Sequence, residues 1–222
     1  MKKILYSVAL AACCMGTMTS CSDFLDASNK SNVTAKQSFA TKEGLNNLVN
    51  NAYQHLQNVY AAPLFTSCFS AGTDMYADAR NKMNEALNTY ETLTPENTDI
   101  KNLYTYLYSG IRAANSVSYY AQTAQVDDKI KGQLVCEGRV LAAYEYYLLV
   151  NNFGGVPIMK DFLTTADTGY PKSSAADVYA YIISELEDVI GKNVLQASRA
   201  TKGGGRISQE TAKAILAKTY LS

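Results

Sequence analysis

The sequence lacks several residues on which common catalytic and metal sites depend. It contains no tryptophan and a single histidine, His55. One histidine excludes the HExxH zinc motif, and no CxxC pair is present to bind a structural zinc ion. The GxSxG nucleophile motif is absent, and the glycine run at residues 203–206 lacks the lysine and hydroxyl residue of a phosphate-binding loop. We therefore predict no catalytic residues, no metal site and no cofactor.

The chain also has no excess of either charge. Its 222 residues include 20 Lys or Arg and 20 Asp or Glu. A surface without a positive excess is poorly suited to nucleic-acid phosphates, so nucleic-acid binding is disfavoured. The hydrophobic content of 47% excludes a disordered chain. The 17 tyrosines have an apolar ring and a polar hydroxyl, and we expect most of them at the seams between helices.

The amino-terminal segment has the pattern of an export signal. Lys2 and Lys3 precede an uncharged, mostly apolar run at residues 4–18. This run is shorter than the roughly 20 residues that a membrane-spanning helix needs. Cys21 follows two small residues and begins the polar part of the chain. We therefore predict a lipoprotein signal peptide at residues 1–20 and fatty acylation of Cys21, which would anchor the mature chain to a membrane.

A second cleavage site is compatible with the same segment. Cys13 follows Leu10-Ala11-Ala12, which is closer to a standard lipobox in residue type. Cleavage there would leave a short apolar run in the signal and an apolar stub on the mature chain, so Cys21 is favoured. An ordinary secretory signal with incidental cysteines is the other alternative. Residues 21–35 are polar and are predicted to form a lipidated flexible tether, followed by a helical domain at residues 36–222.

Apolar residues recur at steps of three, four and seven in several segments, which is the period of helices that bury one face. Helices are predicted at residues 36–60, 100–120, 128–151, 174–190 and 209–222. Thr41, Ser174 and Ser208 are placed to cap three of them, and Gly191 to end the fourth. No sustained strand alternation is found, so the fold class is predicted to be all-α, with successive helices joined as antiparallel pairs.

Residues 61–99 have no sustained period and are predicted to be mostly loop, with a short helix near residues 81–87. Within them, Asp74, Tyr76, Asp78 and Arg80 place two carboxylates, an arginine and an aromatic ring in one stretch. Such sets hold sugars, because charged side chains bond adjacent hydroxyls while a ring covers the apolar face. These four residues are our candidate ligand site. A structural Asp–Arg pair that fixes the loop is the alternative.

Two further groups receive a structural interpretation. Glu185, Glu187 and Asp188 lie within one predicted helical turn, and such clusters usually form a solvated face. Cys68 and Cys136 are the cysteines of the mature domain. Spacing alone cannot decide whether they pair.

The segment at residues 137–158 reads EGRVLAAYEYYLLVNNFGGVPI and resembles the signature helix and turn of the SusD/RagB family of outer-membrane nutrient-binding lipoproteins. The matching positions are Glu137, Arg139, Leu141, Ala143, Tyr144, Tyr146, Leu149, Val150, Phe153, Gly154, Val156 and Pro157. The helix beginning near Asp177 and the Gly205-Arg206 element with its following helix also resemble the family, as does the start at Cys21. Two positions depart from it: Ala142 replaces a frequent arginine and Gly155 a frequent aspartate.

The resemblance implies a tetratricopeptide-like scaffold of helical pairs, equivalent to the amino-terminal half of a SusD-like protein. It implies a lipid-anchored, surface-exposed protein of the outer membrane that binds oligosaccharides, or peptides in some relatives. It would deliver them to a SusC-like, TonB-dependent outer-membrane transporter. Family members are commonly more than twice as long, so we expect a chain that is incomplete at its carboxyl end. A helical scaffold that binds only a protein partner is the alternative from another functional class.

Overall fold

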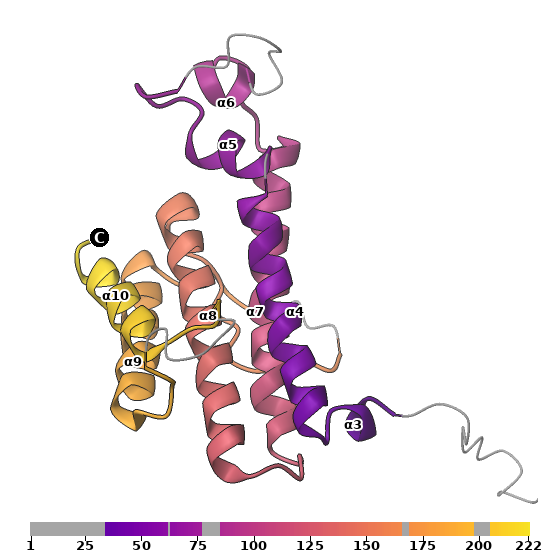
Figure 1. The fold of residues 1–222 in the computed structure, drawn as a ribbon. Coiled ribbons are helices and arrows are strands. Elements are labelled where there is room, and N and C mark those ends of the chain that lie inside the picture. Colours follow the sequence, from indigo (N-terminus) through magenta and orange to yellow (C-terminus); the bar gives the residue numbers. More distant parts are fainter. Residues whose placement is uncertain (1–33, 62, 77–84, 166–168, 198–204) are drawn as a thin grey trace, which may run out of the picture. The chain divides into compact units, whose positions relative to one another are not determined.

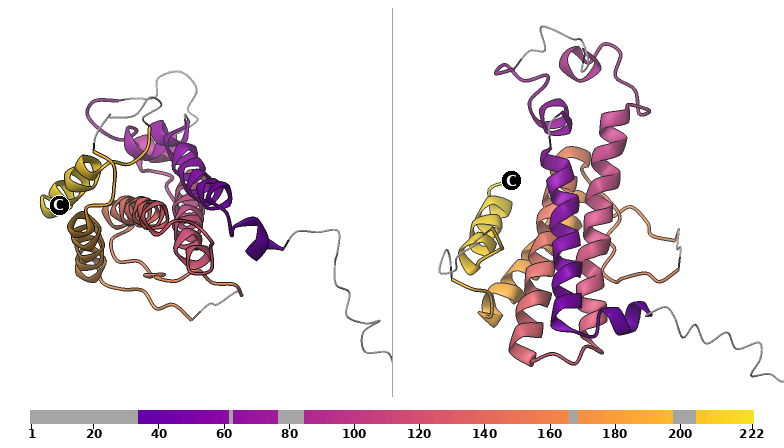
Figure 2. Two further views of the ribbon diagram at one scale, coloured as in Figure 1. Left: turned by 60° about the horizontal axis from the view of Figure 1, so that its bottom comes forward. Right: turned by 45° about the vertical axis from the view of Figure 1, so that its right-hand side comes forward.

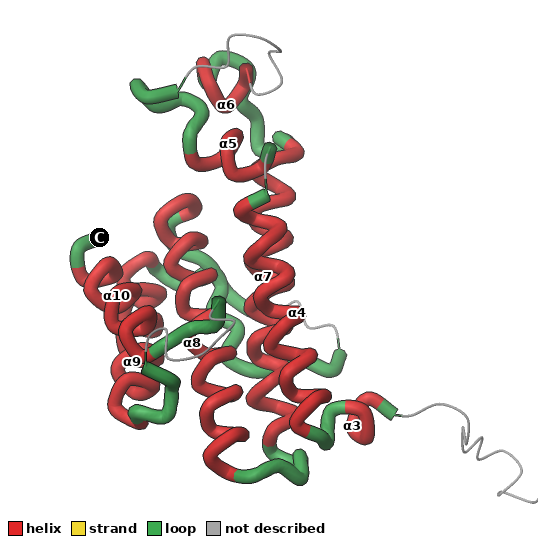
Figure 3. Tube along the Cα trace, in the orientation of Figure 1, coloured by secondary structure: helices red, strands yellow, loops and turns green. Residues whose placement is uncertain are grey.

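The computed structural model describes residues 34–61, 63–76, 85–165, 169–197 and 205–222. The chain divides into two units, residues 1–34 and 35–222, and the fold described below is that of the second unit. Regular structure in the described ranges is entirely helical, without a strand (Figure 3). This confirms the all-α prediction. The predicted signal peptide and the acylation site at Cys21 lie outside the described residues.

Three long helices lie side by side: α4 (Lys42–Tyr60), α7 (Thr98–Ala121) and α8 (Asp128–Phe153) (Figures 1 and 2). The short helix α3 (Ala35–Ser38) precedes them. α4 and α7 run antiparallel, and the amide of Gln125 beyond α7 donates to the carbonyl of Ala40 before α4, at 3.0 Å. α4 and α8 run parallel, because contacts between them join residues that are 84 positions apart at two successive levels. The helical-pair scaffold expected from the sequence is therefore present.

Two further helices extend this layer. α9 (Ala175–Lys192) packs on α8, and α10 (Gln209–Tyr220) packs mainly on α9. The caps expected at Thr41, Ser174 and Ser208 are confirmed, since each hydroxyl accepts a hydrogen bond from an amide in the first helical turn. The end expected at Gly191 is wrong. α9 continues to Lys192 and ends at Asn193, whose φ of 47° is the left-handed conformation that asparagine tolerates.

The buried side chains follow the apolar stripes that the sequence predicts. Leu45, Val49 and Ala52 of α4 are fully buried and belong to one cluster with Val117 of α7 and Leu141 of α8. A second cluster joins α7, α8 and α9. α8 contributes to both clusters and is buried around most of its circumference. This position explains why its sequence is apolar on nearly every side.

The segment between α4 and α7 is more regular than predicted. It contains α5 (Leu64–Phe69) and α6 (Glu85–Thr89), both at the end of the bundle where α4 finishes and α7 begins (Figure 1). The prediction of mostly loop missed α5, because a helix of six residues is too short to show a period. The short helix predicted near residues 81–87 overlaps α6, although residues 81–84 lie outside the described ranges.

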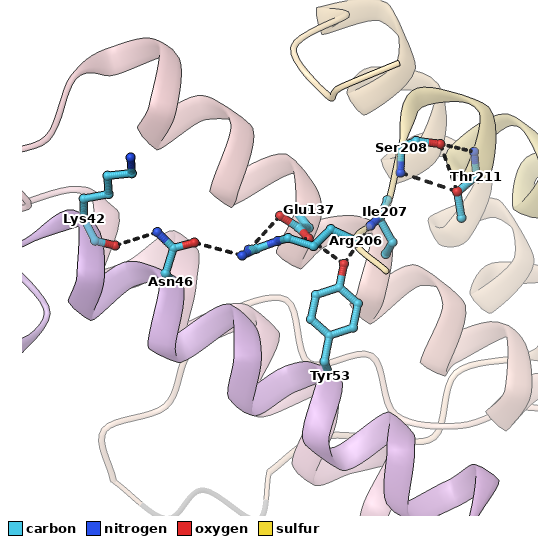
Figure 4. A network of polar contacts seen from close by, with 8 residues as sticks. All are labelled: Lys42, Asn46, Tyr53, Glu137, Arg206, Ile207, Ser208 and Thr211. Carbon is cyan, nitrogen blue, oxygen red and sulfur yellow. Dashed lines mark hydrogen bonds and ion pairs between the residues drawn. The ribbon is translucent and has the colours of Figure 1, made fainter. Parts of the chain in front are cut away.

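A polar network joins α4, α8 and the segment that leads into α10 (Figure 4). The carboxylate of Glu137 is 3% exposed and accepts two hydrogen bonds from the Arg206 guanidinium, at 2.8 and 2.9 Å. Tyr53 donates its hydroxyl proton to Glu137 and accepts from the amide of Ile207 at 2.8 Å. Arg206 also donates to Asn46 at 2.9 Å. These bonds tie the segment before α10 to both α4 and α8. Glu137 and Arg206, which form the ion pair, are 69 positions apart in sequence.

A second ion-pair group joins α8 to α9. Arg139 donates to Glu185 at 2.7 Å and to Asp188, and Lys192 also binds Asp188 at 2.6 Å. The interpretation of the acidic cluster as a purely solvated face is therefore wrong for these two carboxylates. Hydrogen bonds from the Lys192 ammonium and then from the Arg139 guanidinium hold the pKa of Asp188 below its ordinary value.

Candidate functional site

The segment between α4 and α7 encloses a cavity of about 300 Å³ at the end of the bundle. Its walls come from α5, α6, the start of α7 and the end of α8. The lining residues are Ser67, Cys68, Ala71, Leu87, Tyr90, Ile100, Leu103, Asn152 and Phe153. We name this space the α5–α6 cavity. Its volume lies at the lower end of the range found for small-ligand sites.

Tyr90 forms an exposed part of the cavity wall. Its side chain is 57% exposed, and its hydroxyl donates to the carbonyl of Gly72 at 3.4 Å. Gly72 has a φ of +75°, and a Cβ atom there would lie 2.1 Å from the Tyr90 hydroxyl oxygen. Tyr90 itself has a φ of 63°, which costs free energy in a bulky residue. Gly72 thus lets the loop after α5 approach the Tyr90 ring, and the ring is presented to solvent on a strained backbone.

The structure describes two of the four predicted ligand residues. Asp74 and Tyr76 are exposed on the loop that follows Gly72, and Tyr76 retains 37% of its side-chain surface. The amide of Tyr76 donates to the carbonyl of Thr73 at 3.4 Å, which turns this loop. Asp78 and Arg80 lie outside the described residues. Gly72 and Tyr90 are 18 positions apart in sequence. Their contact brings Tyr90 to the loop that carries Asp74 and Tyr76.

The opposite wall comes from the end of α8, which extends two residues beyond the helix predicted at residues 128–151. Asn152 and Phe153 end α8, and Asn152 uses its amide nitrogen to donate to the carbonyl of Leu148 at 2.7 Å. Tyr104 of α7 is 36% exposed and contacts the edge of Phe153 at 5.1 Å between ring centroids. Tyr104 also contacts Tyr108, with 4.8 Å between the ring centroids, and neither ring is among the lining residues of the cavity.

Cys68 lines the cavity but is not suited to act as a nucleophile. Burial, and then the nearby carboxylate of Asp99, raise the pKa of its thiol to about 11. The thiol therefore stays protonated at neutral pH, and the thiolate is the reactive species. Cys136 is also a free thiol, and burial raises its pKa. The open question of pairing is settled in the structure, since the two cysteines form no disulfide.

The cavity can bind a ligand through ring faces, an amide and hydroxyl groups. No group of three or more potential metal ligands occurs among the residues that the structure describes. In the same ranges, no helix is both long and apolar enough to cross a bilayer. Glu145 is completely buried between α7 and α8, and this burial raises the pKa of its carboxyl group well above the ordinary value. Glu145 does not line the cavity. The groups that line the cavity offer contact through shape and hydrogen bonds.

Solved structures with the same arrangement of helices belong to bacterial glycan-binding proteins. Surface glycan-binding protein A from Bacteroides uniformis superposes with a TM-score of 0.69 at 25% identity, over 81% of this chain and 41% of that one. A laminarin-binding SusD-like protein gives a TM-score of 0.71 at 22% identity, over 81% of this chain and 40% of that one. Surface glycan-binding protein A from Bacteroides thetaiotaomicron, solved in complex with laminarihexaose, gives a TM-score of 0.66 at 21% identity, over 82% of this chain and 39% of that one.

The chain thus spans about two fifths of the length of these solved relatives. No curated protein matches it. The model of a SusD-like family, described as starch-binding and associating with the outer membrane, matches residues 23–221. This match includes the signature segment at residues 137–158 and the Gly205-Arg206 element, which the Glu137–Arg206 ion pair joins in space. The chain belongs to the SusD-like family.

Proposed function

We propose that the chain binds an oligosaccharide at the α5–α6 cavity and carries out no chemistry on it. The observation that supports this most directly is the exposed Tyr90 ring at the mouth of a cavity that also presents Asn152. A tyrosine face covers the apolar C–H surface of a sugar, while amide and hydroxyl groups bond its hydroxyls. Asp74 and Tyr76 on the adjoining loop extend this surface. Asp78 and Arg80 complete the candidate set on sequence grounds.

We propose that binding occurs at the outer membrane. The amino-terminal export pattern supports an anchor at acylated Cys21, and the family description supports association with the outer membrane. From there it would pass the oligosaccharide to a SusC-like, TonB-dependent transporter. Metabolic labelling with palmitate tests the anchor, and a Cys21→Ala variant should lose the label and the membrane association. A Cys13→Ala variant should keep both.

Ligand binding is tested by isothermal titration of malto- and laminari-oligosaccharides, with a peptide panel beside them. We expect saturable binding of one oligosaccharide series. Tyr90→Ala should weaken oligosaccharide binding by at least tenfold, because an aromatic ring that covers a sugar face supplies a large part of the contact area. Asp74→Ala and Arg80→Ala should weaken it by smaller factors. Tyr220→Ala is the matched control, because Tyr220 is 59% exposed, nearly the same as Tyr90, but lies on α10.

Three other results would overturn the proposal. Binding of peptides without oligosaccharides would assign the chain to a peptide-binding branch of the family. Silence toward both classes, together with recovery of a transporter in a pull-down, would favour a scaffold that binds only a protein partner. Equal effects of Tyr90→Ala and Tyr220→Ala would place the ligand elsewhere on the molecule.

A further inference from the structure

The outer side of α4 borders a second cavity, which is an open groove of about 480 Å³. We name it the α4 groove. Its lining residues are Asn50, Tyr53, Gln54, Leu56, Gln57, Tyr60, Gly205 and Arg206. Most of these side chains are uncharged and polar. The groove therefore differs from an apolar protein-docking surface and from an anion site.

The amide side chains in the groove form a continuous row on α4. Asn50, Gln54 and Gln57 are spaced at i, i+4 and i+7, so they lie on one face over two helical turns, about 10 Å. All three are exposed. Gln54 makes a long hydrogen bond of 3.4 Å to Asn58, and its acceptor oxygen remains available. Each amide offers both donors and an acceptor, which matches the donor and acceptor character of sugar hydroxyls.

The opposite wall has its charge neutralised. The guanidinium of Arg206 is bound by both oxygens of Glu137, and Tyr53 uses its hydroxyl on Glu137 and on the amide of Ile207 (Figure 4). Arg206 is therefore already paired and offers little attraction to a phosphate or carboxylate ligand. The groove as a whole suits a neutral ligand with many hydroxyl groups.

An aromatic surface forms the end of the groove nearest α5. Tyr60 is 41% exposed, and its hydroxyl is hydrogen-bonded to that of Tyr144, which fixes the ring. Phe65 of α5 is 37% exposed and lies 5.3 Å from the Tyr60 ring between centroids. The same short helix supplies Ser67 and Cys68 to the α5–α6 cavity. α5 therefore lines the cavity directly and contacts the groove through the ring pair of Phe65 and Tyr60.

We propose that the α4 groove is an accessory subsite for neutral oligosaccharides, occupied by the part of a long chain that extends past α5 from the α5–α6 cavity. This inference rests on the proposed function, because it assumes that the cavity holds one end of the ligand. Its consequence is selectivity for length. A short oligosaccharide fills the cavity alone, and a longer one gains hydrogen bonds from the amide row and a ring contact from Tyr60.

The test is a titration of malto- and laminari-oligosaccharides of two to six sugar units into the 222-residue chain. The double variant Asn50→Ala/Gln57→Ala removes two groove amides. Its matched control is Asn47→Ala/Asn51→Ala, which removes two exposed amides of the same helix that do not line the groove. Both variants replace helix residues by alanine, the strongest helix former, so neither should weaken α4 intrinsically. Thermal unfolding of each variant verifies that it folds.

We expect the wild type to bind the hexasaccharide about tenfold more tightly than the disaccharide. The groove variant should lose most of this difference, with unchanged disaccharide affinity, because each of the two lost hydrogen bonds costs a few-fold in affinity, while Gln54 and Tyr60 remain. The control variant should behave as the wild type. Affinity that does not depend on length, or a length dependence in the groove variant equal to that of the wild type, overturns the subsite while leaving the proposed function intact. Absence of binding by the wild type to every member of both series refutes the proposed function for glucans and the subsite with it.

Discussion

Replacing Glu145 by glutamine should remove one pH-dependent component of the unfolding free energy and stabilise the chain at neutral pH. Glu145 is 0% exposed, and neither of its carboxyl oxygens has a hydrogen-bond partner among the described residues. It lies against the backbone of α7, where a Cβ atom added to Gly110 would be 1.8 Å from its Oε1. Burial raises the pKa of this carboxyl group well above its ordinary value of 4.5.

The sign of the effect follows from where the proton is bound. Above pH 4.5 the unfolded chain loses the Glu145 proton, while the folded chain keeps it until the pH reaches the raised folded pKa. The folded state therefore binds more protons in this window, and the unfolding free energy falls as the pH rises. One proton of difference corresponds to about 1.4 kcal/mol for each pH unit. Glutamine has the same shape and no proton to lose, so its contribution does not change with pH.

The assay is denaturant unfolding of the wild type and Glu145→Gln at half-unit intervals from pH 4.5 to 7.5. We expect similar unfolding free energies near pH 4.5 and a difference in favour of the variant that grows by about 1.4 kcal/mol per pH unit, until it levels at the folded pKa. Parallel pH profiles would refute the reasoning. They would mean that Glu145 ionises in the folded chain with a pKa near that of the unfolded chain.

Three further changes probe other contacts in the fold. Arg206→Ala should lower the unfolding free energy by roughly 2 kcal/mol, because it leaves the Glu137 carboxylate, which is 3% exposed, without its charged partner. The loss is smaller than for a fully buried ion pair, since the Arg206 side chain is 40% exposed. Equal stability of the variant and the wild type in denaturant unfolding would contradict this. Gly110→Ala should destabilise by about 2 kcal/mol through its clash with Glu145, and Glu145→Ala in the same chain should restore part of that loss. Alkylation of Cys68 by iodoacetamide at pH 8 should be slower than that of a free cysteine and should accelerate toward pH 11, as followed by mass spectrometry.

The long helices could be predicted from the sequence because each buries a wide apolar face. α7 and α9 follow their predicted ranges closely, and the expected cap at Ser174 forms a capping box with Asp177 at the third position. The end of α9 was misplaced because Gly191 was given the role that Asn193 fulfils with a left-handed backbone. Both residue types are used to end helices, and only the backbone conformation distinguishes them.

One departure from the family pattern has a simple steric explanation. A Cβ atom at Gly155 would lie 2.2 Å from the carbonyl oxygen of Ser173. The two segments approach closely here, since the amide of Ser173 donates to the carbonyl of Val156 at 3.2 Å. Glycine at this position permits that approach, whereas an aspartate would require the segment before α9 to move. The sequence showed the substitution but could not show which backbone lies opposite.

The candidate site was only partly predictable, because its walls come from distant segments. Asp74 and Tyr76 were predicted as ligand residues because polar and aromatic side chains are close together in this stretch of sequence. They lie on the loop beside Tyr90. Tyr90, Asn152 and Phe153 were not singled out as ligand residues. Tyr90 follows a short helix, and the other two end a buried one. No local pattern indicates that these three residues line one space.

The contacts of the signature residues explain why the sequence identifies the family more readily than it identifies a ligand. Glu137 is bound to Arg206, and Arg139 to Glu185 and Asp188, so the charged members of the motif hold α8 to its neighbours. Tyr146 is likewise fully buried, and its hydroxyl accepts from the amide of Met159 at 2.7 Å. Side chains committed in this way cannot also contact a sugar. Under the proposed function, the residues that set ligand preference are those of the α5–α6 segment and the exposed amides of α4. Substitutions there should therefore change the ligand without changing the fold, while substitutions in the signature should do the reverse.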